Sequence, residues 1–250
     1  MANYDNQSTR YGSTVARGAE GVIDQGLRAH MLRVYNYMAL GLVLTGVTAW
    51  AVANTSLGSL FFTTTVTGGL AMTGLGWIAF LAPIALVLVL SFGVQRMSVG
   101  TAQLVFWVYA ALMGVSLATI FFAYTMASIT QVFFVSAAAF GATSLWGYTT
   151  KRDLTSIGSF LFMGLIGIVI ASIVNIFLGS SALGFAISII GVLVFTGLTA
   201  YDTQKIKEMY YVGDDGTVAG RKAIMGALSL YLDFINLFLM MLRLFGNQRN

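Results

Sequence analysis

Seven long apolar stretches limit the fold of this chain more than any other feature. A helix needs about 20 mostly apolar residues to cross the hydrocarbon core of a bilayer. Only 9% of the residues are charged, well below the roughly 25% of a soluble domain. The stretches lie at about residues 34–53, 75–95, 102–123, 129–149, 157–178, 182–202 and 223–243. The sequence therefore predicts an all-α integral membrane protein with seven transmembrane helices.

The segments outside these stretches are polar. We expect residues 1–33 to form a polar cytoplasmic tail, residues 34–245 one transmembrane domain, and residues 246–250 a C-terminal tail. Residues 54–74 are rich in Thr and Gly, which predicts a loop with at most an interfacial turn. The first residues include no apolar core of a signal peptide, so we expect none to be cleaved. With no cysteine, disulfides and thiol chemistry are excluded.

The basic residues indicate the orientation. Eleven of the 13 Lys and Arg residues precede the first stretch or follow the second, fourth or sixth. Basic residues in short loops remain cytoplasmic, so the N-terminus is expected inside and, after seven spans, the C-terminus outside. If the last stretch were a re-entrant hairpin instead, the C-terminus would return to the cytoplasm. Because topology explains the net charge of +4, we expect no nucleic-acid partner.

Asp233 is the only charged residue in the apolar run 223–242. A carboxylate near the middle of a membrane helix costs about 2.5–3.5 kcal/mol on insertion scales, and such groups usually handle ions or protons. The alternative is a carboxylate held by a structural partner such as Asn236 or Tyr231. Asp233 is therefore the first candidate for a functional residue.

Asp202 ends the preceding apolar stretch, on a helix that must run antiparallel to the last one. Two acids in one low-dielectric site share a proton rather than both ionising, and they titrate as a pair. Such a pair offers hard oxygen ligands to Ca²⁺. However, Asp233 lies about 15 Å deeper along its helix, so contact requires the Asp202 helix to continue toward and past Glu208. Otherwise Asp202 is a solvated residue beside Lys205.

The sequence around these acids resembles a known family. Ala200-Tyr201-Asp202-Thr203-Gln204 and the later run Ala227-Leu228-Ser229-Leu230-Tyr231-Leu232-Asp233-Phe234-Ile235-Asn236-Leu237-Phe238 are similar to the conserved segments of the Bax inhibitor-1 (transmembrane Bax inhibitor motif) family. The resemblance implies an all-helical bundle with the last helix at its centre. It also implies a pH-sensitive calcium leak governed by Asp202 and Asp233. Arg96 is then a candidate latch for the pair; by itself it is a topology determinant.

Three functions follow as hypotheses. The first is a proton-gated calcium leak channel in a bacterial plasma membrane, with calcium as the transported ion and no cofactor. The second is a regulatory protein that binds a membrane-protein partner, such as a membrane protease or a component of cell death, with the acids only structural. The third, an intramembrane aspartyl protease, lacks the Gly-x-Gly-Asp and Pro-Ala-Leu motifs, so we expect no enzyme.

Overall fold

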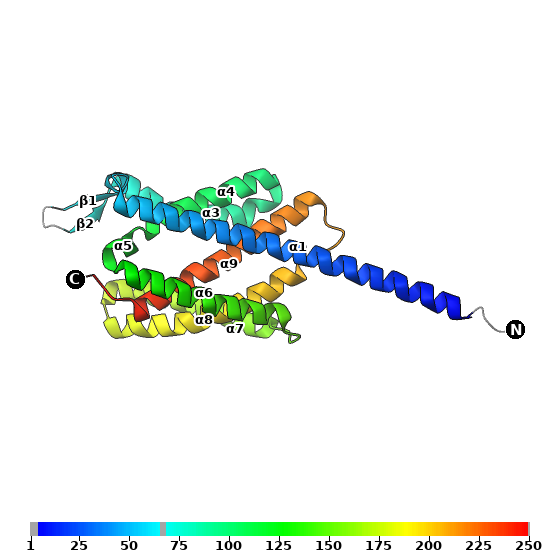
Figure 1. Cartoon of the computed structure of the whole chain (residues 1–250). Helices are drawn as coiled ribbons and strands as arrows, with labels where there is room; N and C mark the ends of the chain where they lie inside the picture. Colours follow the sequence, from blue (N-terminus) through cyan, green and yellow to red (C-terminus); the bar gives the residue numbers. More distant parts are fainter. Residues whose placement is uncertain (1–4, 66–68, 250) are drawn as a thin grey trace.

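The computed structural model describes residues 5–65 and 69–249, with side chains described from Gln25 onward. Apart from a short hairpin, the described chain is helical (Figure 1). The elements are α1 (Asp5–Asn54), α2 (Gly58–Phe61), β1 (Phe62–Thr64), β2 (Leu70–Met72), α3 (Gly74–Gly93), η1 (Val94–Arg96), α4 (Val99–Leu117), α5 (Thr119–Ala123), α6 (Met126–Thr149), α7 (Thr155–Leu178), α8 (Ser181–Glu208) and α9 (Gly216–Phe245).

Local sequence explains most of the helix starts. A Ser, Thr or Asp side chain stands before each of five long helices and accepts a hydrogen bond from a backbone N–H of the first turn, as favoured N-caps do. These residues are Thr73, Ser98, Thr125, Ser180 and Asp215. At the end of α7, Gly179 adopts φ 61°, a left-handed conformation that glycine accepts at little cost.

Seven helices are long and apolar enough to cross a membrane. They contain all seven predicted stretches, but the first, sixth and seventh begin or end well beyond the predicted limits. The spans are Gln25–Asn54, Gly74–Arg96, Val99–Ala123, Met126–Thr149, Thr155–Leu178, Ser181–Glu208 and Gly216–Phe245. Residues 5–33, which we expect to form a polar tail, are helical and belong to α1, and the first span begins at Gln25. Pro83 is the only proline in the sequence, so no proline interrupts the helix before Asn54.

The segment between the first two spans also differs from the prediction. Instead of an irregular loop it forms the short helix α2 and an antiparallel hairpin, in which Phe62 pairs with Met72 and Thr64 with Leu70. The Thr side chains that suggested a loop also favour strands. Thr73 then ends the hairpin and caps α3.

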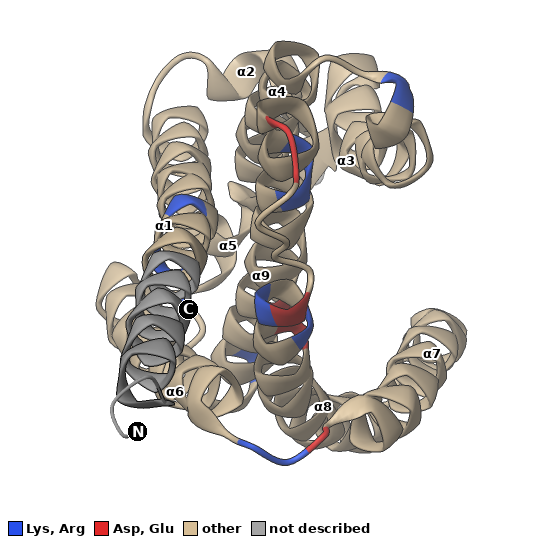
Figure 2. Cartoon of the chain, turned by 90° about the vertical axis from the view of Figure 1, so that its right-hand side faces the viewer, with Lys and Arg blue, Asp and Glu red and all other residues tan. Residues whose placement is uncertain are grey.

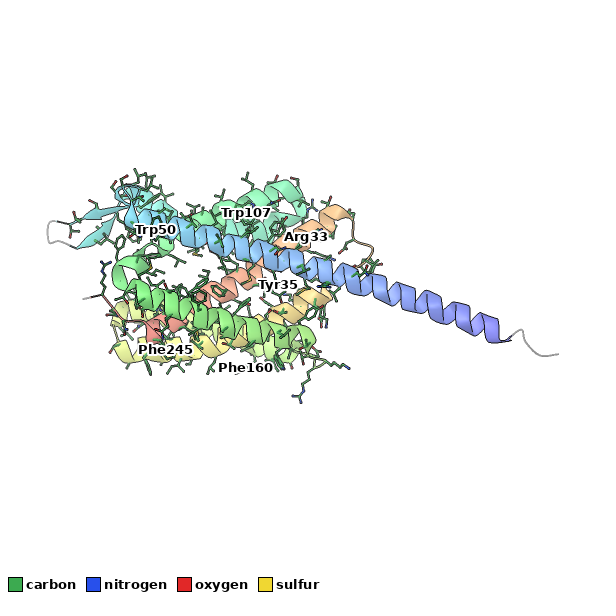
Figure 3. The ribbon with its side chains drawn as sticks, in the orientation of Figure 1. Arg33, Tyr35, Trp50, Trp107, Phe160 and Phe245 are labelled. Carbon is green, nitrogen blue, oxygen red and sulfur yellow. The ribbon has the colours of Figure 1, made fainter. Side chains whose placement is uncertain are left out.

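The last helix lies in the middle of the bundle. Figure 2, which looks along the bundle, shows α9 surrounded by the other long helices. It packs against α1, α4, α6 and α8, while α3 and α7 lie outside, mainly against α4 and α8. In its most apolar window 67% of α9 is buried, against 11–39% in the other six spans. Aromatic side chains such as Trp50 and Phe160 are exposed on the outer surface (Figure 3).

The two ends of the chain lie at opposite ends of the bundle (Figure 1). Helix α9 is continuous over 30 residues, which contradicts the re-entrant alternative for the last stretch. The C-terminal segment is held against the turn between α5 and α6: Arg249 N–H donates to Ala123 O at 2.9 Å, and Asn247 N–H donates to Ser128 Oγ at 2.8 Å. Hydrogen bonds therefore attach residues 246–249 to the bundle, although Asn247, Gln248 and Arg249 are exposed.

Candidate functional site

Asp233 lies at the centre of the bundle. Its residue is only 5% exposed, and Oδ2 is buried with no hydrogen-bond partner among the described residues. The structural partners considered from the sequence are engaged elsewhere: Asn236 donates to Leu232 O, and the Tyr231 hydroxyl bonds to Thr45. A buried polar atom without a partner costs free energy, so the unpaired oxygen of this carboxyl destabilises the folded protein.

Helices α8 and α9 fix which residues face each other. A Cβ added to Gly191 would meet Met240 Cγ at 2.7 Å, and one added to Gly226 would meet Ile206 Cγ2 at 3.1 Å. These two close approaches define an antiparallel register along the whole interface. Small residues of this kind let membrane helices approach closely.

In that register Asp233 lies opposite Leu198 and Thr199, and Asp202 lies about one helical turn away, or roughly 5.4 Å along the axis. Asp233 Oδ2 makes no hydrogen bond to Asp202, but at this separation negative charges on both carboxyls would repel each other. Helix α8 does not end at Asp202 as predicted but continues to Glu208, so Asp202 is half-buried and not the solvated residue of the alternative. We call these two residues the Asp202–Asp233 pair.

A chain of hydroxyl groups leads from α1 to the α8 turn beside the pair. Tyr35 Oη lies 2.6 Å from Ser144 Oγ, and Ser144 Oγ lies 2.9 Å from Thr203 Oγ1. Thr203 Oγ1 donates its proton to Thr199 O at 2.7 Å. Because each hydroxyl has one proton, Ser144 must donate to Thr203 and Tyr35 to Ser144. This chain, the Tyr35–Ser144–Thr203 chain, joins α1, α6 and α8.

The last turns of α8 are held by two further side chains. Gln204 Oε1 accepts from Leu154 N–H at 2.9 Å, and Gln204 Nε2 donates to Arg152 O at 2.8 Å. Lys207 Nζ donates to Tyr148 O at 2.9 Å. The loop between α6 and α7 is thereby fixed to α8, which orients the helix that carries Asp202.

The structure does not bring Arg96 to the pair. Arg96 is exposed at the end of η1, and no ion pair involves it among the described residues. The basic residue that joins the loop between α3 and α4 to α9 is Arg221, whose Nε donates to Met97 O at 2.7 Å. Arg221 has no motif that marks it in the sequence.

A second hydroxyl chain was also not predicted. Thr45 Oγ1 donates to Ala110 O at 2.8 Å, so the Tyr231 hydroxyl, 2.6 Å away, donates to Thr45. It joins α1, α4 and α9. A Thr or Tyr inside an apolar helix is the only sequence signal for such a bond, and it does not identify the partner.

The chemistry available to the pair is limited to protons and cations. The described residues contain no group of three or more His, Cys, Asp or Glu that could hold a metal ion. Ca²⁺ takes six to eight oxygen ligands, so two carboxylates provide only part of such a shell.

Comparison with known proteins identifies the family. Residues 27–250 match the family described as inhibitor of apoptosis-promoting Bax1. The chain is 51% identical to the inner membrane protein YbhL of Escherichia coli K12 over 90% of this chain and 94% of YbhL. It is also 51% identical to the uncharacterized protein RP147 of Rickettsia prowazekii, over 91% and 93% of the two chains, and 46% identical to an uncharacterized protein of Caulobacter vibrioides, over 95% and 96%. The chain is therefore an integral membrane protein that belongs to the Bax inhibitor-1 family.

Proposed function

We propose that this protein is a passive, pH-sensitive calcium leak channel in which the Asp202–Asp233 pair controls passage. The observation that supports the proposal most directly is the carboxyl of Asp233. It is buried in the central helix, has an oxygen with no partner, and lies about one helical turn from a second acid on the neighbouring helix. Intramembrane acids of this kind mark ion and proton pathways.

The mechanism follows from charge. While the pair shares one proton it carries a single negative charge, and α8 and α9 stay packed. Loss of that proton places two negative charges about one helical turn apart, where they repel by about 3 kcal/mol at 6 Å with an effective dielectric constant near 20. The repulsion separates the two helices, and a divalent cation that enters between the carboxylates removes it. Calcium is the transported ion, and the proposal requires neither a cofactor nor an enzymatic reaction.

We place the protein in a bacterial inner membrane with the N-terminus in the cytoplasm and the C-terminus outside. The support is the relative named an inner membrane protein and the distribution of basic residues, which favours the cytoplasmic side for the loops after the second, fourth and sixth spans. A C-terminal reporter that faces the cytoplasm would contradict this orientation.

Calcium flux into liposomes tests the proposal. Asp233→Asn and Asp202→Asn keep the size of each side chain and remove its charge, so we expect both variants to lose the pH response of the flux. Asp214→Asn is the matched control, because Asp214 pairs with Lys222 at the end of the bundle and not with Asp202 or Asp233. Unchanged flux and pH response in both pair variants would refute the proposal. A protein without flux that copurifies with a stoichiometric membrane partner would favour the regulatory function instead.

A further inference from the structure

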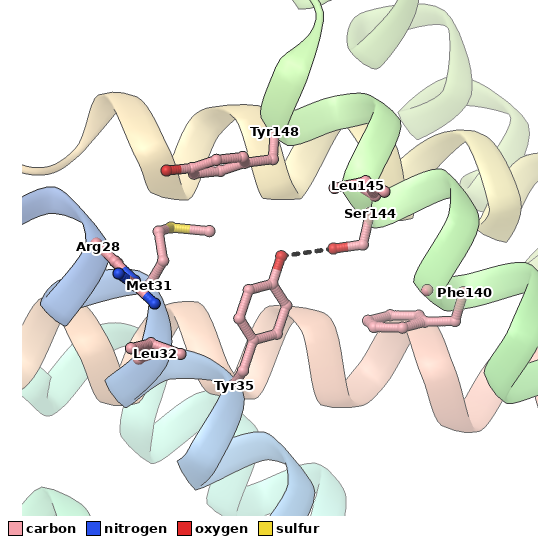
Figure 4. Close-up of a pocket in the computed structure, with 9 residues that line it drawn as sticks. Arg28, Met31, Leu32, Tyr35, Phe140, Ser144, Leu145 and Tyr148 are labelled. Carbon is pink, nitrogen blue, oxygen red and sulfur yellow. Dashed lines mark hydrogen bonds between the residues drawn. The ribbon is translucent and has the colours of Figure 1, made fainter. Parts of the chain in front are cut away.

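A crevice separates α1 from α6 at the end of the bundle that carries Lys151 and Arg152. Its volume is about 810 Å³. Figure 4 shows its walls, which come from the first turns of the α1 span and the last turns of α6. We call it the α1–α6 crevice and define it by Arg28, Leu32, Tyr35, Phe140, Leu145 and Tyr148.

The crevice opens sideways, toward the space that lipid occupies around a membrane protein. Leu32 and Leu145 on its walls are 51% and 63% exposed. A Cβ added to Gly141, which also lines the crevice, would meet no atom within 4 Å. The Tyr35–Ser144 hydrogen bond crosses the floor and satisfies the two hydroxyls there. The interior of the crevice therefore offers mainly apolar surface.

The two ends of the crevice differ in polarity. In Figure 4 Arg28 and the hydroxyl of Tyr148 lie at one end, and Phe140 lies at the other. Arg28 is the one charged residue among those that line the crevice. Arg28 is exposed and has no ion pair among the described residues. An occupant must therefore carry negative charge at one end and an apolar chain at the other.

We propose that the α1–α6 crevice binds one anionic phospholipid. Its phosphate-bearing headgroup lies against Arg28 and the Tyr148 hydroxyl, and one acyl chain lies along Leu32, Leu145 and Phe140. Basic pockets between transmembrane helices bind anionic headgroups. Lipid also surrounds this face at all times, whereas a partner helix would have to displace it. Neither Asp202 nor Asp233 lines the crevice, and lipid retention is measured without calcium flux, so failure of this proposal can be distinguished from failure of the proposed leak.

Lipid retention by the purified protein tests the proposal. Native mass spectrometry and thermal unfolding in detergent would compare phosphatidylglycerol with phosphatidylcholine of the same acyl chains. We expect the wild type to retain one phosphatidylglycerol molecule in preference to phosphatidylcholine. Each cation that contacts the headgroup should raise this preference about fivefold. Gly141→Leu fills the crevice, so it should lose the bound lipid and the lipid-dependent rise in Tm. Arg28→Ala should keep the binding but reduce the preference for phosphatidylglycerol about fivefold.

Gly167→Leu is the matched control. Gly167 lies within α7, and a Cβ there also meets no atom within 4 Å, so this variant should behave as the wild type. Equal lipid retention by the wild type and Gly141→Leu would overturn the proposal. Equal binding of the two lipids by the wild type would overturn the assignment of an anionic headgroup. A copurifying protein that Gly141→Leu removes, with lipid retention unchanged, would assign the crevice to a protein partner instead.

Discussion

Removal of one hydroxyl tests how the helices around the pair are held together. In Ser144→Ala, the Tyr35–Ser144–Thr203 chain loses its middle member and therefore two hydrogen bonds, of 2.6 and 2.9 Å. Thr203 keeps its bond to Thr199 O, whereas the hydroxyl of the half-buried Tyr35 loses its acceptor. The loss should therefore be at least that of the two bonds themselves.

Hydrogen bonds between membrane helices contribute about 0.6 kcal/mol on average and up to about 1.7 kcal/mol. Two such bonds predict that Ser144→Ala lowers the free energy of unfolding by about 1–2 kcal/mol. Ser136 provides the control, because it is buried two turns earlier on the same helix and donates only to Met241 Sδ, at 3.1 Å. A thioether is a weak acceptor, so Ser136→Ala should cost less than about 0.5 kcal/mol.

Equilibrium unfolding in mixed detergent micelles would measure both variants. Tyr35→Phe and the double variant Tyr35→Phe/Ser144→Ala complete a double-mutant cycle, which isolates the energy of the Tyr35–Ser144 bond. We expect a coupling of about 0.5–1.5 kcal/mol. If the two substitutions are additive, or if Ser136→Ala costs as much as Ser144→Ala, the chain does not hold α1 and α6 together.

Three further predictions concern other parts of the chain. Gly147→Ala should lower the Tm, since its Cβ would overlap the α8 backbone, whereas Gly141→Ala should leave the Tm unchanged or raise it slightly. Arg243 lines two cavities, of about 500 and 810 Å³. Its positive charge repels cations there, so Arg243→Gln should increase calcium flux into liposomes severalfold if ions pass these cavities, and unchanged flux would exclude that path. Hydrogen bonds from Thr155 lower the pKa of Asp153, so Asp153 stabilises the start of α7 fully above the ordinary pKa of an aspartate and stops doing so as the pH falls through the lowered pKa. Hydrogen exchange in the first turn of α7 should therefore become faster at low pH, and Asp153→Asn should abolish this pH dependence.

The long helices and the buried acid could be predicted from the sequence because each is a strong local signal. A run of about 20 apolar residues in a membrane protein nearly always forms a transmembrane helix. One carboxylate inside such a run indicates a functional residue, because placing a charge in the membrane costs free energy. The place of Asp202 could not be predicted from local signals. It depends on how far α8 continues and on the close approach of Gly226 to Ile206, which is a property of two helices together.

Other features depend on pairs of residues that are far apart in the sequence. Tyr35 and Ser144 are 109 residues apart, and nothing in either helix identifies the other as its partner. His30 is a further example: it precedes the first apolar stretch, yet it is only 7% exposed, and its ring centre lies 5.8 Å from that of Tyr210. Contacts of this kind appear only when the helices are assembled.

The central position of α9 has a consequence for biosynthesis. The helix at the middle of this bundle leaves the ribosome after the six other spans, because the chain is made from its N-terminus. The six earlier spans must therefore enter the membrane while the space between them that α9 will fill is still unoccupied. When α9 arrives, Asp233 can enter that space against protein instead of lipid, and Thr45 meets Tyr231 at the same time. A chain that stops before residue 216 lacks its own core, so truncation near the C-terminus should be as damaging as loss of the first span.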